Sequence, residues 1–412
     1  MTTGVLRNPD FLRFLGSHVS NELGANIARV AFPLVAVLTL HATPFEVGAL
    51  SALQSAAFLI VGLPAGVWVD RLRRRRVLLT SDLARFLLLG SIPLAALLDL
   101  LSMPLLYAVA LLSGIAQVFN DVADQTYLPT LVAKDGLADG NAKLELARSG
   151  GALAGPGLGG LIAQLLGPPT AVLATSLGAL SSVVLLATIG RSEPRPPVSE
   201  RSGMWAEIRE GLSFVWKDRL QRSIVVATMA TNLCVSAVLG LSVMFLSSVV
   251  HLAPGVIGVL LVSGAVGGII GGLLAARLFE RYGTAKVTWL ALALSSPFGL
   301  LLPLTEADWR ISFFAAASVM LSIGAILYNI GTITYRQTVA PPRLLGRVNA
   351  SVRFLVWGAM PIGAFAGGLV AQQIGVREAL WVFMCGRLLS FLPLLFSPLR
   401  GLRDFAENQA SS

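Results

Sequence analysis

The sequence predicts an all-α membrane protein with twelve transmembrane helices in two pseudo-symmetric six-helix halves. Three observations support this fold class: the apolar composition, the spacing of long apolar runs, and the similarity of the two halves. Of the 412 residues, 55% are hydrophobic and 13% are charged, and the mean hydropathy is +0.75. Soluble domains carry about 25% charged residues, so the composition indicates an integral membrane protein.

Twelve apolar runs are long enough to cross about 30 Å of hydrocarbon, which takes about 20 helical residues. They cover approximately residues 12–40, 45–69, 77–98, 104–127, 142–166, 169–189, 222–249, 254–278, 285–304, 310–335, 345–374 and 377–399. We expect one transmembrane helix in each run.

The basic residues predict the orientation of these spans. They collect in the even-numbered turns, above all in RLRRRR at 71–76 and in the segment 190–221, whereas the opposite side has only Arg310 and Arg377. Basic residues near span ends are retained in the cytoplasm, so we expect both termini there. The net charge of +9 then reflects topology. We expect no nucleic-acid partner, because the chain has no sizeable soluble domain that could carry a basic face.

The segment 190–221 divides the chain into halves at 1–189 and 222–399, followed by a cytoplasmic tail at 400–412. It begins with RSEPRPPVSERSG, whose proline, serine and charge content is typical of a solvated linker. The following stretch MWAEIREGLSFVWKDRL places apolar residues at helical spacing opposite charged ones. It predicts either an amphipathic helix on the cytoplasmic membrane surface or a plain connecting helix.

Two pairs of matching segments predict that the halves are parallel repeats. Gly66-x-x-x-Asp70-Arg71 after span 2 corresponds to Ala276-x-x-x-Glu280-Arg281 after span 8, at an offset of 210 positions. Arg148 and Pro156 of span 5 correspond to Arg353 and Pro361 of span 11, at an offset of 205 positions.

Two six-helix halves, a cytoplasmic linker and G-x-x-x-D-R-x-x-R-R at 66–75 together resemble the major facilitator superfamily. The resemblance implies a cytoplasmic latch between the halves, in which arginines bind carboxylates or headgroups and the Asp caps a helix. Arg73 stands where the family usually has Gly. A loop that is basic only for topology remains the alternative. The residues assigned to this latch are Gly66, Asp70, Arg71, Arg74, Asp82, Arg85, Glu280 and Arg281, with the central cavity as the alternative for Asp82 and Arg85.

Longer stretches are similar to one branch of that family, the bacterial exporters that include macrolide-efflux pumps and the enterobactin exporter. They are YLPTLVAKDGLADGNA (127–142), REGLSFVWKD (209–218) and LLGRVNASVRFLVWGAMPIGAFAGG (344–368). The resemblance implies a secondary transporter of the bacterial inner membrane. It would export small amphiphilic molecules, drug-like, macrolide-like or siderophore-like, by alternating access with proton antiport. Uptake symport of a polar solute and lipid translocation are the alternatives.

GALAGPGLGG at 151–160 contains a G-x-G-x-x-G spacing, but it is not a dinucleotide site. Such a site needs a βαβ unit and an acid about 20 residues later, and no acid occurs between Glu145 and Glu193. The stretch instead matches the span-5 motif of the superfamily's antiporters. Small residues four apart allow two helices to touch, and the proline permits a bend, so ordinary close packing is the alternative. The motif residues are Gly151, Gly155, Pro156, Gly159 and Gly160.

Polar residues within the spans follow helical spacing and therefore share faces. Ionisable groups are costly in hydrocarbon and usually face a cavity, and in the family's fold spans 1, 4, 7 and 10 line the central cavity. The residues that we assign to it are His18, Glu22, Asn26 and Arg29 in span 1, Gln117, Asp121 and Asp124 in span 4, Thr228, Asn232 and Ser236 in span 7, and Asn329, Thr332 and Arg336 in span 10.

Glu22 is the candidate proton-coupling acid, with Arg29 and His18 as its candidate partners. Related exporters often carry an Asp where this chain has Ala25, and the alternative is an internal ion pair of Glu22 with Arg29. His18 is either a proton relay or a polar residue at the cavity entrance. Asp121 and Asp124 either bind a cationic substrate or cap the cytoplasmic end of span 4.

Other classes of protein lack their signatures in this sequence. Three scattered histidines and two distant cysteines offer no metal cluster or nucleophilic site, so we expect no enzyme and no metal. We expect Cys234 and Cys385 to be buried packing residues. No Walker motif is present, so an ion gradient, with protons as the expected ion, is the predicted energy source, without a cofactor. The expected partners are a small-molecule substrate and membrane lipid, and we expect a monomer.

Overall fold

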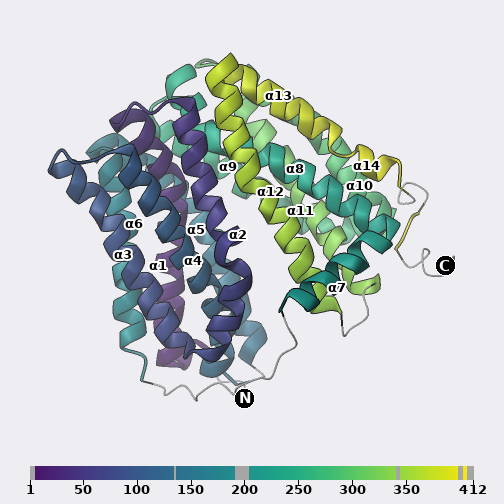
Figure 1. Cartoon of the computed structure of the whole chain (residues 1–412), viewed down its shortest axis with the longest axis horizontal. Helices are drawn as coiled ribbons and strands as arrows, with labels where there is room; N and C mark the ends of the chain where they lie inside the picture. The colour runs from purple at the N-terminus through teal and green to yellow at the C-terminus, as the bar shows by residue number, and fades with distance from the viewer. Residues whose placement is uncertain (1–4, 134–135, 191–203, 340–343, 398–401, 406–412) are drawn as a thin grey trace. The chain divides into compact units, whose positions relative to one another are not determined.

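The computed structural model describes residues 5–133, 136–190, 204–339, 344–397 and 402–405. All regular secondary structure in these ranges is helical (Figure 1), which confirms the predicted class. Eleven of the described helices are long and apolar enough to cross a membrane. The remaining predicted span, 142–166, lies within a 30-residue helix.

The chain divides into two compact units, the first made of the described parts of Met1–Ser199 with Leu252–Val262 and the second of Glu200–His251 with Ser263–Ser412. The linker residues 191–203 and most of the tail lie outside the described residues. The N-terminal part of the chain forms η1 (Val5–Arg7), α1 (Pro9–Leu34), η2 (Val35–Thr39), α2 (Pro44–Arg71), α3 (Arg74–Leu97), α4 (Met103–Leu131), α5 (Leu137–Leu166) and α6 (Pro168–Ala187).

The C-terminal part has the corresponding series after one additional helix, α7 (Met204–Lys217). It consists of α8 (Arg219–Met244), η4 (Phe245–Val249), α9 (Pro254–Tyr282), α10 (Thr284–Ser295), η5 (Ser296–Leu304), α11 (Ile311–Val339), α12 (Leu345–Ile374), α13 (Val376–Leu389) and α14 (Leu392–Leu395). Each predicted span corresponds to one of these helices or to two consecutive ones.

Local sequence explains where several helices begin. The Asn8 side chain accepts from the backbone N–H groups of Asp10 and Phe11 and caps α1. Thr43 and Glu46 form a reciprocal capping box at the start of α2, and Asp218 caps α8 by accepting from the N–H of Gln221. These side chains satisfy N–H groups that have no partner within their own helix.

Residues near the C-terminus cap α10 by accepting hydrogen bonds from its first backbone N–H groups. The backbone carbonyl of Arg403 accepts from the N–H groups of Ala285 at 3.1 Å and Lys286 at 3.3 Å. The Asp404 carboxylate accepts from the N–H of Thr284 at 2.8 Å, and the buried Phe405 ring packs at 5.0 Å from that of Tyr335. The segment 402–405 therefore belongs structurally to the second unit.

The two series of helices repeat in length and in detail. α1 and α8 each have 26 residues and begin 210 positions apart. Each continues into five residues of π-helix, η2 and η4. A histidine with positive φ follows each time, His41 at 53° and His251 at 61°. Such a conformation is uncommon outside glycine, so its recurrence at the same offset supports a parallel repeat.

The offset of 205 positions that pairs Pro156 with Pro361 is corrected by the helix bounds. α5 and α12 both have 30 residues, begin at Leu137 and Leu345, and end before Gly167 and Gly375, both with positive φ. The offset for these helices is therefore 208 positions. At this offset Gly155 corresponds to Gly363, and the two prolines occupy different turns of their helices.

α7 is a helix, as the sequence predicts, and its last turns pack on other helices of the second unit. Val215 is buried in a cluster with Val225 of α8 and Val348 of α12, and Glu210 forms an ion pair with Arg347. The side chains of Trp205 and Ile208 lie outside the described residues.

The prediction for the two cysteines is right for one and wrong for the other. Cys234 is buried on α8, whereas Cys385 on α13 is exposed. Position 385 faces outward because the buried face of α13 consists of residues such as Leu380, Met384 and Arg387.

Candidate functional site

A buried polar cluster lies at the junction of four helices in the first unit. At its centre is the fully buried carboxylate of Asp82 in α3. It accepts hydrogen bonds from Asn21 of α1 at 3.1 Å, Asn120 of α4 at 2.8 Å and Ser182 of α6 at 2.5 Å. Asp82 therefore connects helices that are far apart in sequence.

The positive charge that balances Asp82 comes from its own helix. Arg85 is one helical turn further along α3, and its Nη1 lies 3.5 Å from Asp82 Oδ1 and 2.9 Å from Asn21 Oδ1. Both side chains are almost completely buried. Buried charges are tolerated when they are paired and hydrogen-bonded; here the two charges are paired, and three neutral side chains bond to the carboxylate.

The structure places Asp82 and Arg85 inside the unit, although the sequence assigns them to the cytoplasmic latch. Sequence reasoning missed their partners Asn21, Asn120 and Ser182. Two of them had a detectable signal, since Asn21 lies within the polar stripe of span 1 and Asn120 lies between Gln117 and Asp124. Ser182 had none, because a serine is unremarkable in an apolar helix.

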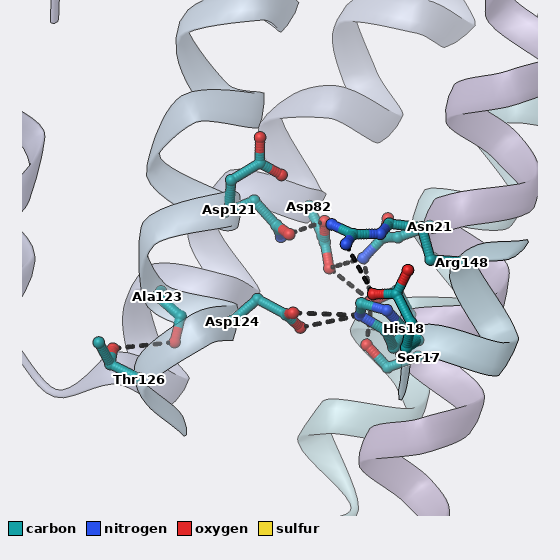
Figure 2. A network of polar contacts seen from close by, with 12 residues as sticks. Ser17, His18, Asn21, Asp82, Asp121, Ala123, Asp124, Thr126 and Arg148 are labelled. Atoms are coloured by element: carbon teal, nitrogen blue, oxygen red, sulfur yellow. Dashed lines mark hydrogen bonds and ion pairs between the residues drawn. The ribbon is translucent and has the colours of Figure 1, made fainter. Parts of the chain in front are cut away.

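A second group of polar side chains joins α1 to α4 (Figure 2). His18 Nδ1 lies 3.1 Å from Asp124 Oδ2 and 3.2 Å from Oδ1, and the dashed lines in Figure 2 mark these two contacts. One turn away, Gln117 donates to Asp121 at 2.6 Å. The structure thus brings together His18 and Asp124, which the sequence proposed for different roles. Their side chains are only partly buried, at 12% and 19% exposure.

Glu22 lies on the same helix as His18, where α1 meets the glycine-rich part of α5. A Cβ added to Gly151 would lie 3.0 Å from the backbone carbon of Glu22, and one added to Gly159 would lie 3.0 Å from the carbonyl oxygen of Ile27. A Cβ on Gly155 would collide with Asn26. The motif predicted for span 5 therefore provides direct backbone contact with the helix that carries Glu22.

Asn26 and Arg29 complete the stripe of span 1. Asn26 is buried and donates to the carbonyl oxygen of Glu22 at 2.8 Å, and its own Oδ1 is buried without a partner among the described residues. Arg29 is exposed, and no ion pair between Glu22 and Arg29 is recorded. Their separation of seven positions corresponds to about 10 Å along the helix.

The residues assigned to the cytoplasmic latch have varied surroundings. Arg71, Glu280 and Arg281 are exposed, Arg74 is partly buried, and the Asp70 side chain lies outside the described residues. A Cβ on Gly66 would meet nothing within 4 Å. The neighbouring Arg75 has a specific role, since it donates to the carbonyl oxygens of Leu186 and Ala187 at 3.0 and 2.8 Å. It caps the C-terminus of α6, where a cation is favoured.

The polar residues predicted in the second unit mostly bond to its own backbone. Asn232 donates to the carbonyl oxygen of Val356 at 3.2 Å, and Ser236 donates to that of Met360 at 2.7 Å. Both bonds join α8 to α12. Thr228 is 2.7 Å from the hydroxyl of Tyr328. Three further predicted residues lie on α11: Asn329, which is exposed, Thr332, which is buried, and Arg336, which is partly buried.

The chemistry available in the first unit is that of carboxylates and an imidazole. These groups can hold or release a proton and can bind a cation. In the part of the chain that the structure describes, no group of three or more His, Cys, Asp or Glu side chains could hold a metal ion.

Two relatives are similar to this chain over almost its whole length. The chain is 27% identical to the multidrug efflux pump Tap of Mycolicibacterium fortuitum over 413 aligned positions, covering 95% of this chain and 98% of the relative. It is 24% identical to YfiS of Bacillus subtilis, an uncharacterised transporter of the major facilitator type, over 93% of this chain and 91% of the relative.

Solved structures share the fold at lower identity. The nucleoside transporter NupG has a TM-score of 0.76 at 12% identity, covering 94% of this chain and 98% of that chain. A bacterial homologue of the iron transporter ferroportin has a TM-score of 0.75 at 17% identity, covering 94% and 98%. The Major Facilitator Superfamily model matches residues 14–364. With this match over most of its length, the chain belongs to the Major Facilitator Superfamily and is a multi-pass membrane transporter.

Proposed function

We propose that this transporter exports small amphiphilic molecules in exchange for protons, and that it prefers cationic substrates. Its similarity to a multidrug efflux pump extends over nearly the whole of both chains, which supports export of drug-like compounds. The glycine contacts between α5 and α1 are compatible with antiport, because they hold the backbone of Glu22 in a defined place on α1, one turn from His18.

The contact between His18 and Asp124 is the observation that carries the proposal. A carboxylate beside an imidazole can share a proton, and its affinity for that proton changes when a cation binds nearby. Glu22 is on the same helix one turn from His18, and Asp121 is one turn from Asp124. In our proposal a cationic substrate and a proton compete for this group of acids, so binding of one releases the other.

The preference for cations follows from the balance of charge around this group. Glu22, Asp121 and Asp124 supply carboxylates from α1 and α4. The basic side chains near them are His18, the exposed Arg148 of α5, and the buried Arg85 of α3, whose charge is already balanced by Asp82. Arg148 is itself paired with Glu145 at 2.6 Å. A cationic amphiphile would gain electrostatic attraction there, and an anionic one would be repelled.

The test uses inverted membrane vesicles in which respiration has established a proton gradient. A pH-sensitive dye reports proton release when a cationic substrate such as ethidium is added, and ethidium fluorescence reports its transport. We expect Glu22→Gln and Asp124→Asn each to reduce the substrate-induced proton flux at least tenfold. The matched control is Glu306→Gln. Glu306 lies between two spans and is paired with Arg377, so this variant should behave as the unchanged protein.

Four outcomes would contradict the proposal. Ethidium transport that continues unchanged with a protonophore would exclude proton coupling. Full coupling in both acid variants would remove the assigned site. Net movement of substrate into intact cells down the proton gradient would favour uptake symport, and activity only on a fluorescent phospholipid would favour lipid translocation.

We also propose that the protein is a monomer in the bacterial inner membrane with both termini in the cytoplasm. The asymmetry of basic residues between the two sides supports this orientation.

A further inference from the structure

The second unit contains a buried arginine that has no counter-charge among the described residues. Arg387 on α13 is 2% exposed. The structure records no hydrogen bond or ion pair from its guanidinium to any described residue, and its Nε is buried without a partner. A guanidinium carries five N–H donors and stays charged in proteins, so burying it alone is very costly.

No acid in the described part of the second unit is placed to neutralise it. Every acid there either has another recorded partner or is exposed at a helix end. Those with partners are Glu210 with Arg347, Asp218 with Gln221 and Tyr335, Glu306 with Arg377, Asp308 with Arg310, and Asp404 with Thr284. The exposed ones are Glu280 and Glu378.

The repeat shows how the first unit balances its own buried arginine. There Asp82 neutralises Arg85, and Asn21 is 3.1 Å from Ser182. α3 and α10 begin 210 positions apart, so Leu292 stands in place of Asp82 and Ser295 in place of Arg85. The second unit thus has no acid at this position, and it receives its arginine from a different helix.

The second unit nevertheless has a polar pair that corresponds to Asn21 and Ser182. Thr231 of α8 and Ser390, just after α13, occupy the positions of Asn21 and Ser182, and their hydroxyl oxygens are 2.8 Å apart. Ser390 follows Arg387 by one turn and donates to its carbonyl oxygen at 2.7 Å. The thiol of Cys234, on the same helix as Thr231, lies near the arginine backbone, since a Cβ on Gly386 would be 3.1 Å from its Sγ.

From this arrangement we propose that Arg387 binds a small inorganic anion inside the second unit, beside the thiol of Cys234. The hydroxyl hydrogens of Thr231 and Ser390 now engage Ser390 and the carbonyl oxygen of Arg387, and they can rotate toward the bound anion. The anion takes the place that the Asp82 carboxylate has in the first unit. Chloride fits the site best, because the four side chains are all at most 9% exposed and leave little access for a lipid headgroup or a substrate carboxylate. The proposal does not depend on the direction of transport or on its coupling ion.

The test measures thermal unfolding of the full-length protein in detergent while chloride replaces gluconate at constant ionic strength. A ligand that binds only the folded state raises the midpoint in a saturable way. We expect such a rise, of a few degrees, for the unchanged protein with chloride and bromide. Arg387→Met, similar in length and uncharged, should show no dependence on halide. Arg310→Gln, which changes an exposed arginine paired with Asp308, should respond like the unchanged protein.

A second variant keeps the test decisive if Arg387→Met does not fold. Ser390→Ala leaves the charge in place, removes one donor, and should shift half-saturation to a higher chloride concentration. The proposal is overturned if the unchanged protein does not respond to halide, or if Arg387→Met responds equally. It is also overturned if stabilisation requires phosphatidylglycerol in nanodiscs rather than chloride, which would identify a lipid phosphate as the anion.

Discussion

Single residues in this transporter are defined most clearly by how their charge is balanced. Asp82 and Arg85 depend on each other, because each supplies the counter-charge of the other in a buried site. Three neutral side chains then satisfy the carboxylate. The pair follows from neither composition nor helical spacing alone, since an i, i+3 acid and base also occur on exposed surfaces.

Replacing Asp82 by Asn should destabilise the protein by about 3–5 kcal/mol, because it leaves Arg85 buried without a counter-charge. The double variant Asp82→Leu with Arg85→Ser copies Leu292 and Ser295 of the second unit and should recover most of that loss. Thermal unfolding of the purified variants measures both effects. A double variant less stable than Asp82→Asn would show that the hydrogen bonds of the carboxylate matter more than its charge.

At the scale of elements, the contact between α1 and α5 determines where Glu22 lies. The glycines of α5 allow its backbone to touch α1 at Glu22, Asn26 and Ile27. α12 makes the corresponding contact with α8, where a Cβ on Gly367 would lie 2.8 Å from that of Ala237. Close approach through small residues is a common way for membrane helices to associate, so the motif has a structural role that does not itself depend on transport direction.

Gly155→Ala should weaken this contact, because its Cβ would collide with Asn26 and the two helices must separate. Overpacking of this kind costs about 1–3 kcal/mol. Gly157→Ala is the matched control. Its Cβ would meet nothing within 4 Å, and alanine is favoured over glycine within a helix by about 1 kcal/mol. We expect a lower midpoint of unfolding for Gly155→Ala and an equal or higher one for Gly157→Ala. Equal midpoints for the two variants would contradict a backbone contact at Gly155.

For the whole molecule, the basic turns predict which ends of the helices face the cytoplasm. In a background with both cysteines replaced by serine, single cysteines at Leu72, between α2 and α3, and at Asp99, between α3 and α4, report the two sides. We expect a membrane-impermeant maleimide to label Asp99→Cys in intact cells from outside. Leu72→Cys should react only after permeabilisation. Reversed labelling would invert the proposed topology, and the asymmetry of basic residues would then need another explanation.

Much of the architecture could be predicted because long apolar segments leave little choice of structure. The twelve predicted runs correspond closely to the helices, as with 345–374 and α12. The internal changes of helix type could not be predicted. η2 and η4 are π-helical and η5 is a 3-10 helix, although all three lie in apolar segments whose composition does not distinguish them from α-helix.

By itself the sequence determined that this is a helical membrane protein with a repeated design and polar faces on particular spans. Those properties depend on hydrophobicity and local periodicity, which can be read from neighbouring residues in the sequence. Tertiary structure decided which polar groups meet. It paired His18 with Asp124, enclosed Asp82 among three helices, and placed no acid of the described chain beside Arg387. These outcomes depend on contacts between residues up to about 160 positions apart, and the charge balance of a buried group is set by neighbours that local sequence does not identify.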